Sequence, residues 1–260
     1  MMKILLPLDG NPKSETILPF AVNLALRREA ELIAVRVMDP VALGGEPLAP
    51  LVSENFYRDV VAGGEEYLAT LPARYPDVNL RTICQVGFPR ELIRELAERE
   101  KCDLIVFASH GHSGLVRWIW GSLAEGVSRV APCPVLLVRG HMPLHFHNVL
   151  IPIDSSAVSA SVAERVSLFL EADSKITVLH CADAKHPLPD RPALDVKFSS
   201  SPAPEGISQW LASHDCDLVA MSSHGRDGID HMLWGSVAEQ VARTAPCPVM
   251  IFPPSACNSH

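Results

Sequence analysis

The sequence predicts two tandem α/β domains, each built on a doubly wound, Rossmann-like parallel sheet, and three observations support this prediction. Short runs that are apolar throughout alternate with helical patterns, as in parallel sheets that helices cover on both faces. The Ser-His-Gly and Gly-Ser motifs at 109–111 and 121–122 return at 223–225 and 235–236. The 260 residues suffice for two domains of about 110–140 residues each.

The repeat extends well beyond these motifs. An Ala-Pro-Cys-Pro-Val segment at 131–135 returns at 245–249, and the offset is constant at 114 residues from Cys102/Cys216 to this segment. Self-similarity over such a length indicates a duplicated structural unit. We therefore assign the first domain to residues 1–141 and the second to residues 146–260.

In the first domain, apolar runs and the turn signals between them predict five strands and four helices. The expected strands are 4–8, 32–38, 78–86, 103–108 and 135–138. The first expected helix places Ile17, Phe20, Ala21 and Leu24 on one face, and the second spans about 54–71. A third begins at Gly-Phe-Pro (87–89), and a fourth follows the glycine loop to about residue 130.

The second domain repeats this order in a shorter form. Its expected strands include 149–153, 176–181, 194–199 and 249–251, and its first helix places Val162, Val166 and Phe169 on one face. The offset to the first copy is 145 at the first strand and 144 at the second, but 114 from the third helix onward. About thirty residues are therefore missing, and helix 54–71 has no expected counterpart.

Composition and charge argue against several classes of protein. The net charge of −8 argues against a general nucleic-acid binder, which needs a basic face, and against docking on anionic lipid. No apolar run approaches the roughly 18–20 residues of a membrane span. The start of the chain resembles a first strand without a small-residue cleavage site, so we expect a cytoplasmic protein with seven reduced cysteines.

Two features point to a binding site at the carboxyl ends of the strands. Asp9 ends the first strand, and a carboxylate there can accept hydrogen bonds from ribose hydroxyls. The fourth strand leads through a glycine loop into a helix, whose unpaired N–H groups and partial positive charge attract phosphate. Ligands of doubly wound folds bind at this edge of the sheet. A purely structural role for the glycines, in a tight turn and close helix–sheet packing, stays open.

These motifs resemble the universal stress protein family, in which a tandem two-domain form is common. Nucleotide-binding members carry a Gly-x2-Gly-x9-Gly-Ser/Thr loop, and the resemblance covers nearly the whole chain. Here the first loop glycine is replaced by Ala108 in copy one and by Ser222 in copy two. The other shared features are the first-strand Pro-x-Asp, the Gly-x-Pro-x-Glu helix start at 87–91 and the Pro-Cys-Pro-Val segment before the last strand.

The resemblance implies a nucleotide site in each copy. Adenine would lie against the backbone of Val37, Asp9 would hold the ribose, and Gly111 would lie near the ribose and phosphates. Gly121 and Ser122 would contact the phosphates. The candidate binding residues are Asp9, Val37, Ala108, His110, Gly111, Gly121 and Ser122 in the first copy, and Asp154, Cys181, Ser222, His224, Gly225, Gly235 and Ser236 in the second.

The second site differs around its loop. Asp227 and Asp230 flank the glycines and would oppose phosphate by like charge, while Arg226 partly offsets them. The alternative for this copy is a domain kept for dimer-like pairing. We expect His110 and His224 to shape the loop or touch ligand rather than to act in catalysis, and we expect no metal site.

Together, the sequence and the resemblance predict a stress-response regulator that binds ATP or another adenine nucleotide, with or without Mg²⁺. We expect no catalytic residues and at most slow ATP hydrolysis. A genuine ATPase or nucleotidyl transferase, and a nucleotide-free scaffold that acts through protein association, stay open. The two copies are expected to pair within one chain through the strands at 135–138 and 249–251. A homodimer of the whole chain is left open.

Overall fold

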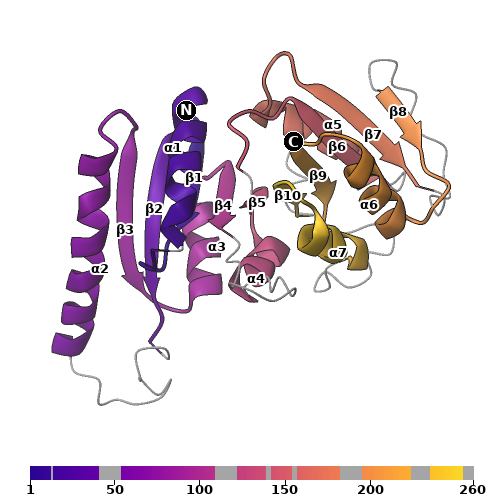
Figure 1. Ribbon diagram of the computed structural model, residues 1–260. Helices are drawn as coiled ribbons and strands as arrows, with labels where there is room; N and C mark the ends of the chain where they lie inside the picture. The colour runs from indigo at the N-terminus through magenta and orange to yellow at the C-terminus, as the bar shows by residue number, and fades with distance from the viewer. Residues whose placement is uncertain are drawn as a thin grey trace. The chain divides into compact units, whose positions relative to one another are not determined.

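A computed structural model describes residues 1–12, 14–40, 54–108, 122–138, 142–153, 157–181, 195–223 and 235–253 (Figure 1). For residues 54–57 and 157–160 it describes the backbone alone. The chain divides into two compact units, Met1–Ala108 and Ser109–His260.

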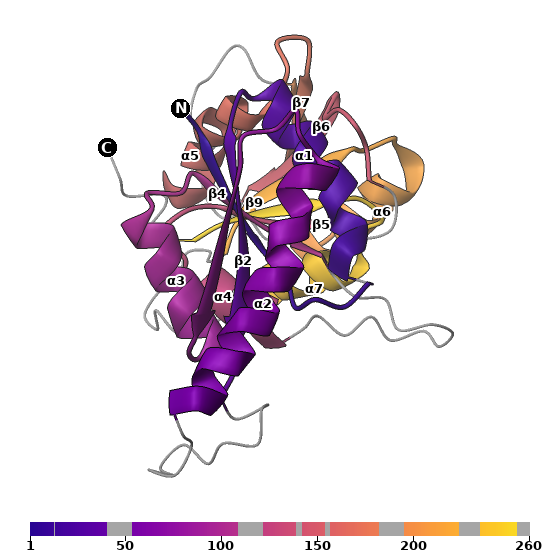
Figure 2. The same ribbon diagram turned by 90° about the vertical axis from the view of Figure 1, so that its left-hand side faces the viewer.

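The first unit is a parallel sheet with helices on both faces. Its strands are β1 (Lys3–Pro7), β2 (Glu31–Met38), β3 (Leu80–Val86) and β4 (Leu104–Ala108), in the order β3-β2-β1-β4. Its helices are η1 (Ser14–Ile17), α1 (Leu18–Arg27), α2 (Glu54–Arg74) and α3 (Pro89–Arg99). Figure 2 shows α3 on the opposite side of this sheet from α1 and α2. This arrangement confirms the predicted α/β fold class.

The apolar pattern of the sequence accounts for these elements. Ile17, Phe20, Ala21 and Leu24 are all buried, as the helical periodicity predicts. The central residues of β1, β2 and β4 are buried too, because helices cover both faces of the sheet. Pro89 stands at the start of α3, where its missing N–H costs no hydrogen bond.

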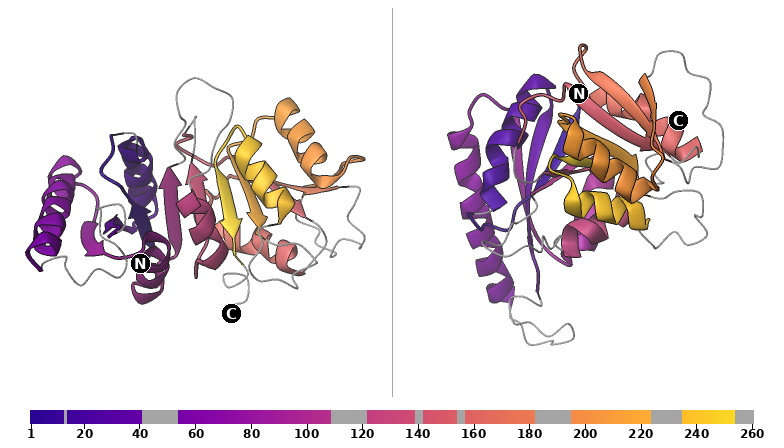
Figure 3. Two further views of the ribbon diagram at one scale, coloured as in Figure 1. Left: turned by 90° about the horizontal axis from the view of Figure 1, so that it is seen from below. Right: turned by 45° about the vertical axis from the view of Figure 1, so that its right-hand side comes forward.

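The second unit contains the complete second copy and the last elements of the first. From the first copy come α4 (Ser122–Val130) and β5 (Val135–Val138). The strands of the second copy are β6 (Asn148–Ile153), β7 (Lys175–His180), β8 (Asp195–Phe198), β9 (Leu218–Ser222) and β10 (Val249–Phe252). Its helices are α5 (Ala157–Val166), η2 (Ser167–Phe169), α6 (Ala203–Ser213) and α7 (Ser236–Thr244). Figure 3 shows α6 and α7 side by side.

The strand order of the second unit is β5-β10-β9-β6-β7-β8. All neighbours in it pair in parallel except β5 and β10, which are antiparallel. The order β8-β7-β6-β9-β10 is that of a doubly wound sheet.

Strand registers reproduce the sequence repeat. Pro7 pairs with Val35, and its counterpart Pro152 pairs with Leu179, at the predicted offsets of 145 and 144. Val35 in turn pairs with Ile83, whereas Leu179 pairs with Lys197, so the offset falls to 114 at the third strand. Only residues 181–194 connect β7 to β8, too few for a counterpart of the 21-residue helix α2.

The pairing of β5 with β10 is symmetric with respect to the repeat. Val135 pairs with Ile251, Leu136 with Met250, and Leu137 with Val249. Because Leu136 and Met250 are repeat counterparts, exchanging the two strands leaves the pattern unchanged, as in an isologous contact between identical subunits. The expected pairing of 135–138 with 249–251 is therefore present. Through it β5 belongs to the second compact unit, while the domain bounds 1–141 and 146–260 stay a prediction from the repeat.

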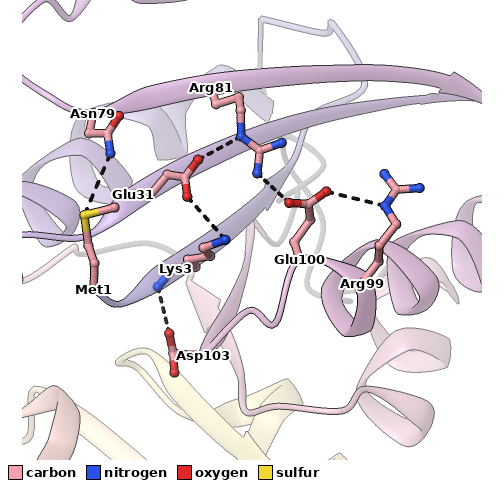
Figure 4. Close-up of polar contacts among 8 residues, drawn as sticks. All are labelled: Met1, Lys3, Glu31, Asn79, Arg81, Arg99, Glu100 and Asp103. Carbon is pink, nitrogen blue, oxygen red and sulfur yellow. Dashed lines mark hydrogen bonds and ion pairs between the residues drawn. The ribbon is translucent and has the colours of Figure 1, made fainter.

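A network of charged side chains ties the amino ends of the first unit's strands together (Figure 4). Glu31 lies 3.6 Å from the Lys3 ammonium and 2.8 Å from Nε of Arg81. Arg81 also donates to Glu100 at 2.6 Å. The backbone N–H of Lys3 donates to Asp103 at 2.8 Å, and in the second unit that of Asn148 donates to Asp217 at the same distance. This backbone contact therefore repeats between the copies.

Replacing Glu100 with glutamine should lower the free energy of unfolding at neutral pH but not at acidic pH. The hydrogen bond from Arg81 holds the pKa of Glu100 below its ordinary value, so the contact stabilises the fold when the carboxyl is ionised. The contribution is full above about pH 5 and is lost as the pH falls through the lowered pKa. Because Arg81 is 41% exposed, water screens the pair and we expect about 1 kcal/mol or less.

Urea unfolding at pH 7 and at pH 3 measures this effect. Glu95→Gln, on the same helix but 59% exposed, is the control, and it should change stability less than Glu100→Gln at pH 7. An equal loss from Glu100→Gln at both pH values would contradict the electrostatic origin.

Among the described residues, no helix is both long and apolar enough to span a bilayer.

Candidate functional site

The carboxyl ends of β1 and β4 bring two of the predicted site residues to the same level of the sheet. Leu5 pairs with Ile105, and three further residues along this register place Leu8 beside Ala108. Asp9 follows directly, so it stands just beyond the end of β4. Ala108 is half-buried and Asp9 is exposed. The first unit thus presents Asp9 at the strand edge where the sequence places it.

The end of β2 extends past β1 and exposes backbone polar groups. Pairing of β1 with β2 ends at Pro7 and Val35, whereas pairing of β2 with β3 continues to Met38 and Val86. The carbonyl of Val35 accepts from the N–H of Leu8 at 2.8 Å, so it points toward β1. Because backbone direction alternates along a strand, the N–H and C=O of Val37 point the same way, beyond the end of β1. Val37 is only half-buried there.

The carboxylate of Asp9 has a fixed orientation. Its Oδ1 accepts from the backbone N–H of Asn11 at 2.9 Å and from the hydroxyl of Ser14. Ser14 is only 5% exposed and belongs to η1, so the turn after β1 and the start of the helix hold this side chain together. Ser14 was not among the sequence-predicted residues. The sequence signal for this arrangement is the Asp-Gly-Asn turn, because an aspartate in such a turn commonly accepts a hydrogen bond from the backbone N–H two residues further on.

A positive charge lies against the same turn. Gly10 has a φ of +77°, and a Cβ placed there would be 3.0 Å from the guanidinium carbon of Arg36. That carbon also lies 5.1 Å from the ring centre of Tyr67, on α2. Burial, reinforced by the Glu15 carboxylate, raises the pKa of Tyr67 to about 12, so its phenol stays neutral. Sequence reasoning missed Arg36, although a charged residue within an apolar strand was a signal.

In the second unit, the residue that corresponds to Val37 has different surroundings. Extending the β6–β9 register by three residues from Leu150 and Val219 puts Ile153 beside Ser222 at the strand ends. Cys181 directly follows β7 and is only 2% exposed. A Cβ on Gly206 of α6 would lie 3.1 Å from Cys181 Sγ and 2.6 Å from Ser199 Oγ. The position that corresponds to Val37 is therefore closely covered.

Gly235 precedes α7 without needing the conformational freedom of glycine. Its φ of −60° and ψ of 130° suit any residue, its N–H donates to Ser223 at 3.0 Å, and no side chain caps the helix. Ser236 begins α7 and Ser122 begins α4, and both are exposed.

The sequence of the chain matches the universal stress protein family over residues 1–139 and 188–253. The chain belongs to the universal stress protein family. It is 36% identical over 142 residues to universal stress protein MJ0531 of Methanocaldococcus jannaschii, covering 53% of this chain and 81% of that protein. Matches of about half the chain fit the tandem two-domain form.

One solved universal stress protein is similar in structure over nearly the whole chain. The crystal structure of one from Archaeoglobus fulgidus has a TM-score of 0.74 at 17% identity, with 96% of this chain and 98% of that one covered. Another, in complex with cAMP, has a TM-score of 0.37 at 22% identity, with 55% of this chain and 98% of that one covered. The similarity to the Archaeoglobus fulgidus structure shows the fold of this chain.

In this universal stress protein, only part of the predicted site falls within the described residues. Asp9, Val37 and Ala108 lie at the strand ends of the first unit, and Ser122, Cys181, Ser222, Gly235 and Ser236 belong to the second. The predicted residues that lie outside the described ranges are His110, Gly111, Gly121, Asp154, His224 and Gly225, together with Arg226, Asp227 and Asp230.

Proposed function

We propose that this universal stress protein binds an adenine nucleotide, ATP or another, with or without Mg²⁺, and acts in the cytoplasm as a stress-response regulator. The observation that carries the proposal is the end of β2, where the backbone N–H and C=O of Val37 point past the last residue of β1. A donor and an acceptor on one residue suit the polar edge of a purine. The fixed carboxylate of Asp9 stands next to this edge.

The remaining contacts follow from the chemistry of a nucleotide. Asp9 would accept hydrogen bonds from ribose hydroxyls, since an ionised carboxylate is an acceptor only. Phosphates would meet backbone N–H groups of the glycine loop, with Gly111, Gly121 and Ser122 in the first copy. Ala108, in place of the family's first glycine, adds one methyl group at the edge of this loop.

The two copies are proposed to associate within the chain as a pseudo-dimer, and the symmetric pairing of β5 with β10 supports this. The nucleotide-free scaffold, which would act through that association alone, is the second candidate function.

Nucleotide identification in protein purified without added ligand tests the proposal. The protein is denatured, and the released small molecules are separated and identified by mass spectrometry. We expect an adenine nucleotide, and calorimetric titration of emptied protein should show heat on binding ATP. An empty protein that gives no binding heat with ATP, ADP or cyclic AMP would overturn the proposal and favour the scaffold. Multiple-turnover release of phosphate would instead identify an ATPase.

The first copy should bind nucleotide more tightly than the second. Val37 is half-buried with its backbone at the sheet edge, whereas Cys181 is covered by α6. Asp227 and Asp230 add like charge near the expected phosphates, each costing about 1 kcal/mol or less at a screened surface. The two charges together would weaken the second site by at most about thirtyfold.

Separate Asp9→Ala and Asp154→Ala variants measure this ranking by calorimetry. We expect Asp9→Ala to remove most of the bound nucleotide and Asp154→Ala to remove little. Because Asp9 also accepts from Asn11 and Ser14, Ser14→Ala serves as the control: it loses the hydroxyl contact and keeps the carboxylate. A larger loss from Asp154→Ala would reverse the ranking.

A further inference from the structure

Two cysteines lie next to each other at the amino ends of β9 and β10. Val219 pairs with Val249, and the N–H of Val219 donates to the carbonyl of Pro248 at 3.0 Å. Cys216 lies two residues before β9 and Cys247 two residues before β10, so the two cysteines stand where neighbouring strands begin. The thiol of Cys216 donates to the carbonyl of Leu218 at 3.3 Å and lies within hydrogen-bond reach of the Cys247 thiol, and neither cysteine is in a disulfide. This is the opposite end of the strands from the proposed nucleotide site.

The spacing of the strands suits a covalent link between these thiols. Neighbouring strands are about 4.8 Å apart, and a stagger of one residue gives a Cα–Cα distance of about 5.8 Å. Disulfides span Cα–Cα distances of about 4.4–6.8 Å. Because both cysteines precede their strands, the alternation of side chains along a strand does not hold the two thiols on opposite faces of the sheet, and a bond between Cys216 and Cys247 falls within this range.

The two thiols differ in their exposure to solvent and in the direction in which their pKa values are shifted. Cys216 is partly exposed, and the hydrogen bond from Cys247 lowers its pKa, which favours the nucleophilic thiolate. Cys247 is only 6% exposed, and its hydrogen bond with Cys216, together with burial, raises its pKa. A thiolate that solvent can reach, beside a buried second thiol, is the arrangement typical of redox-sensing cysteines.

We propose that Cys216 and Cys247 form an oxidation site that hydroperoxides convert to a disulfide. The Cys216 thiolate attacks one peroxide oxygen, the O–O bond breaks, and hydroxide or alkoxide leaves with a proton from solvent. Cys247 then loses its proton, attacks the sulfur of the resulting sulfenic acid and displaces water. The two thiols together supply the two electrons that reduce the peroxide.

The first copy provides a matched control. Cys102 holds the repeat position of Cys216, but it is 7% exposed, and burial above all raises its pKa to about 12. It should therefore react slowly with peroxide. Cys102→Ser should leave formation of the Cys216–Cys247 disulfide unchanged, although it removes a cysteine from the equivalent position.

The test maps disulfides in the full-length chain. Reduced protein is treated with stoichiometric hydrogen peroxide and digested without reductant, and the peptides are analysed by mass spectrometry. We expect a peptide that links Cys216 to Cys247 in wild type and in Cys102→Ser. Cys216→Ser should give no linked peptide, and Cys247→Ser should accumulate sulfenic acid at Cys216 that dimedone captures.

The wild-type map alone can overturn the proposal, so it does not depend on any variant folding. If Cys216 and Cys247 appear only in separate peptides after peroxide treatment, whether unreacted or oxidised to sulfinic acid, the proposal is wrong. A disulfide from Cys216 to any other cysteine would overturn it equally.

Discussion

Replacing Gly121 with valine is expected to abolish nucleotide binding at the first site and to leave the fold intact. Gly121 lies outside the described residues, but its repeat counterpart Gly235 has a φ of −60° and a ψ of 130°. Valine adopts these angles without strain, so the substitution acts through the bulk it adds where phosphate would approach. We expect affinity to fall at least about a hundredfold, equivalent to about 2.7 kcal/mol.

Calorimetric titration with ATP checks this result, and thermal unfolding checks the fold. The matched variant is Gly235→Val, which should remove binding at the second site only, and the double variant should bind no nucleotide. Wild-type affinity in Gly121→Val would mean that the glycine serves the structure of the loop, the alternative that the sequence left open.

Replacing Gly64 with alanine is expected to destabilise the protein by about 1–2 kcal/mol through overpacking. The glycine lies where α2 packs on β2 and β3, and a Cβ there would be 2.4 Å from Cys84 Sγ and 3.4 Å from Met38 Sδ. To make room, Cys84 must turn away and lose its weak contact with the carbonyl of Val61. The gain in helix propensity offsets only part of this cost.

The neighbouring glycine provides the control. A Cβ on Gly63 would meet nothing within 4 Å, so Gly63→Ala should stabilise α2 by up to about 1 kcal/mol. The two adjacent substitutions should therefore shift the free energy of unfolding in opposite directions. Cys84→Ala should rescue Gly64→Ala in a double-mutant cycle, because it removes the sulfur that the new methyl group meets. Equal effects of the two glycine variants would contradict this packing.

The repeat made the fold predictable to the level of strand register. Offsets of 145, 144 and 114 were already visible in the sequence. The pairings of Pro7 and Pro152 reproduce the first two, and the pairings of the second strands with the third reproduce the last. Apolar runs identified the strands because a sheet covered on both faces requires them. The ends of elements were less predictable. For example, α2 continues past Pro72 to Arg74, since loss of one N–H near a helix end does not stop its last turn.

The surroundings of the site were less predictable, because they depend on contacts between distant segments. Asp9 was found from its place at a strand end. The position of the Arg36 guanidinium between Gly10 and Tyr67, in contrast, depends on contacts among β2, α2 and the turn after β1. The contact between Cys216 and Cys247 likewise needs β9 and β10 to be neighbours in a known register. Residue type and spacing alone do not contain such information.

The antiparallel pairing of β5 with β10 also limits how copies of the chain can assemble. β10 has β9 on one side and β5 on the other, so no edge of β10 remains to which a strand from a second molecule could add. Since β5 and β10 belong to one polypeptide, their encounter is intramolecular, and dilution does not lower the local concentration of one strand at the other. Any homodimer of the chain must therefore use a different surface.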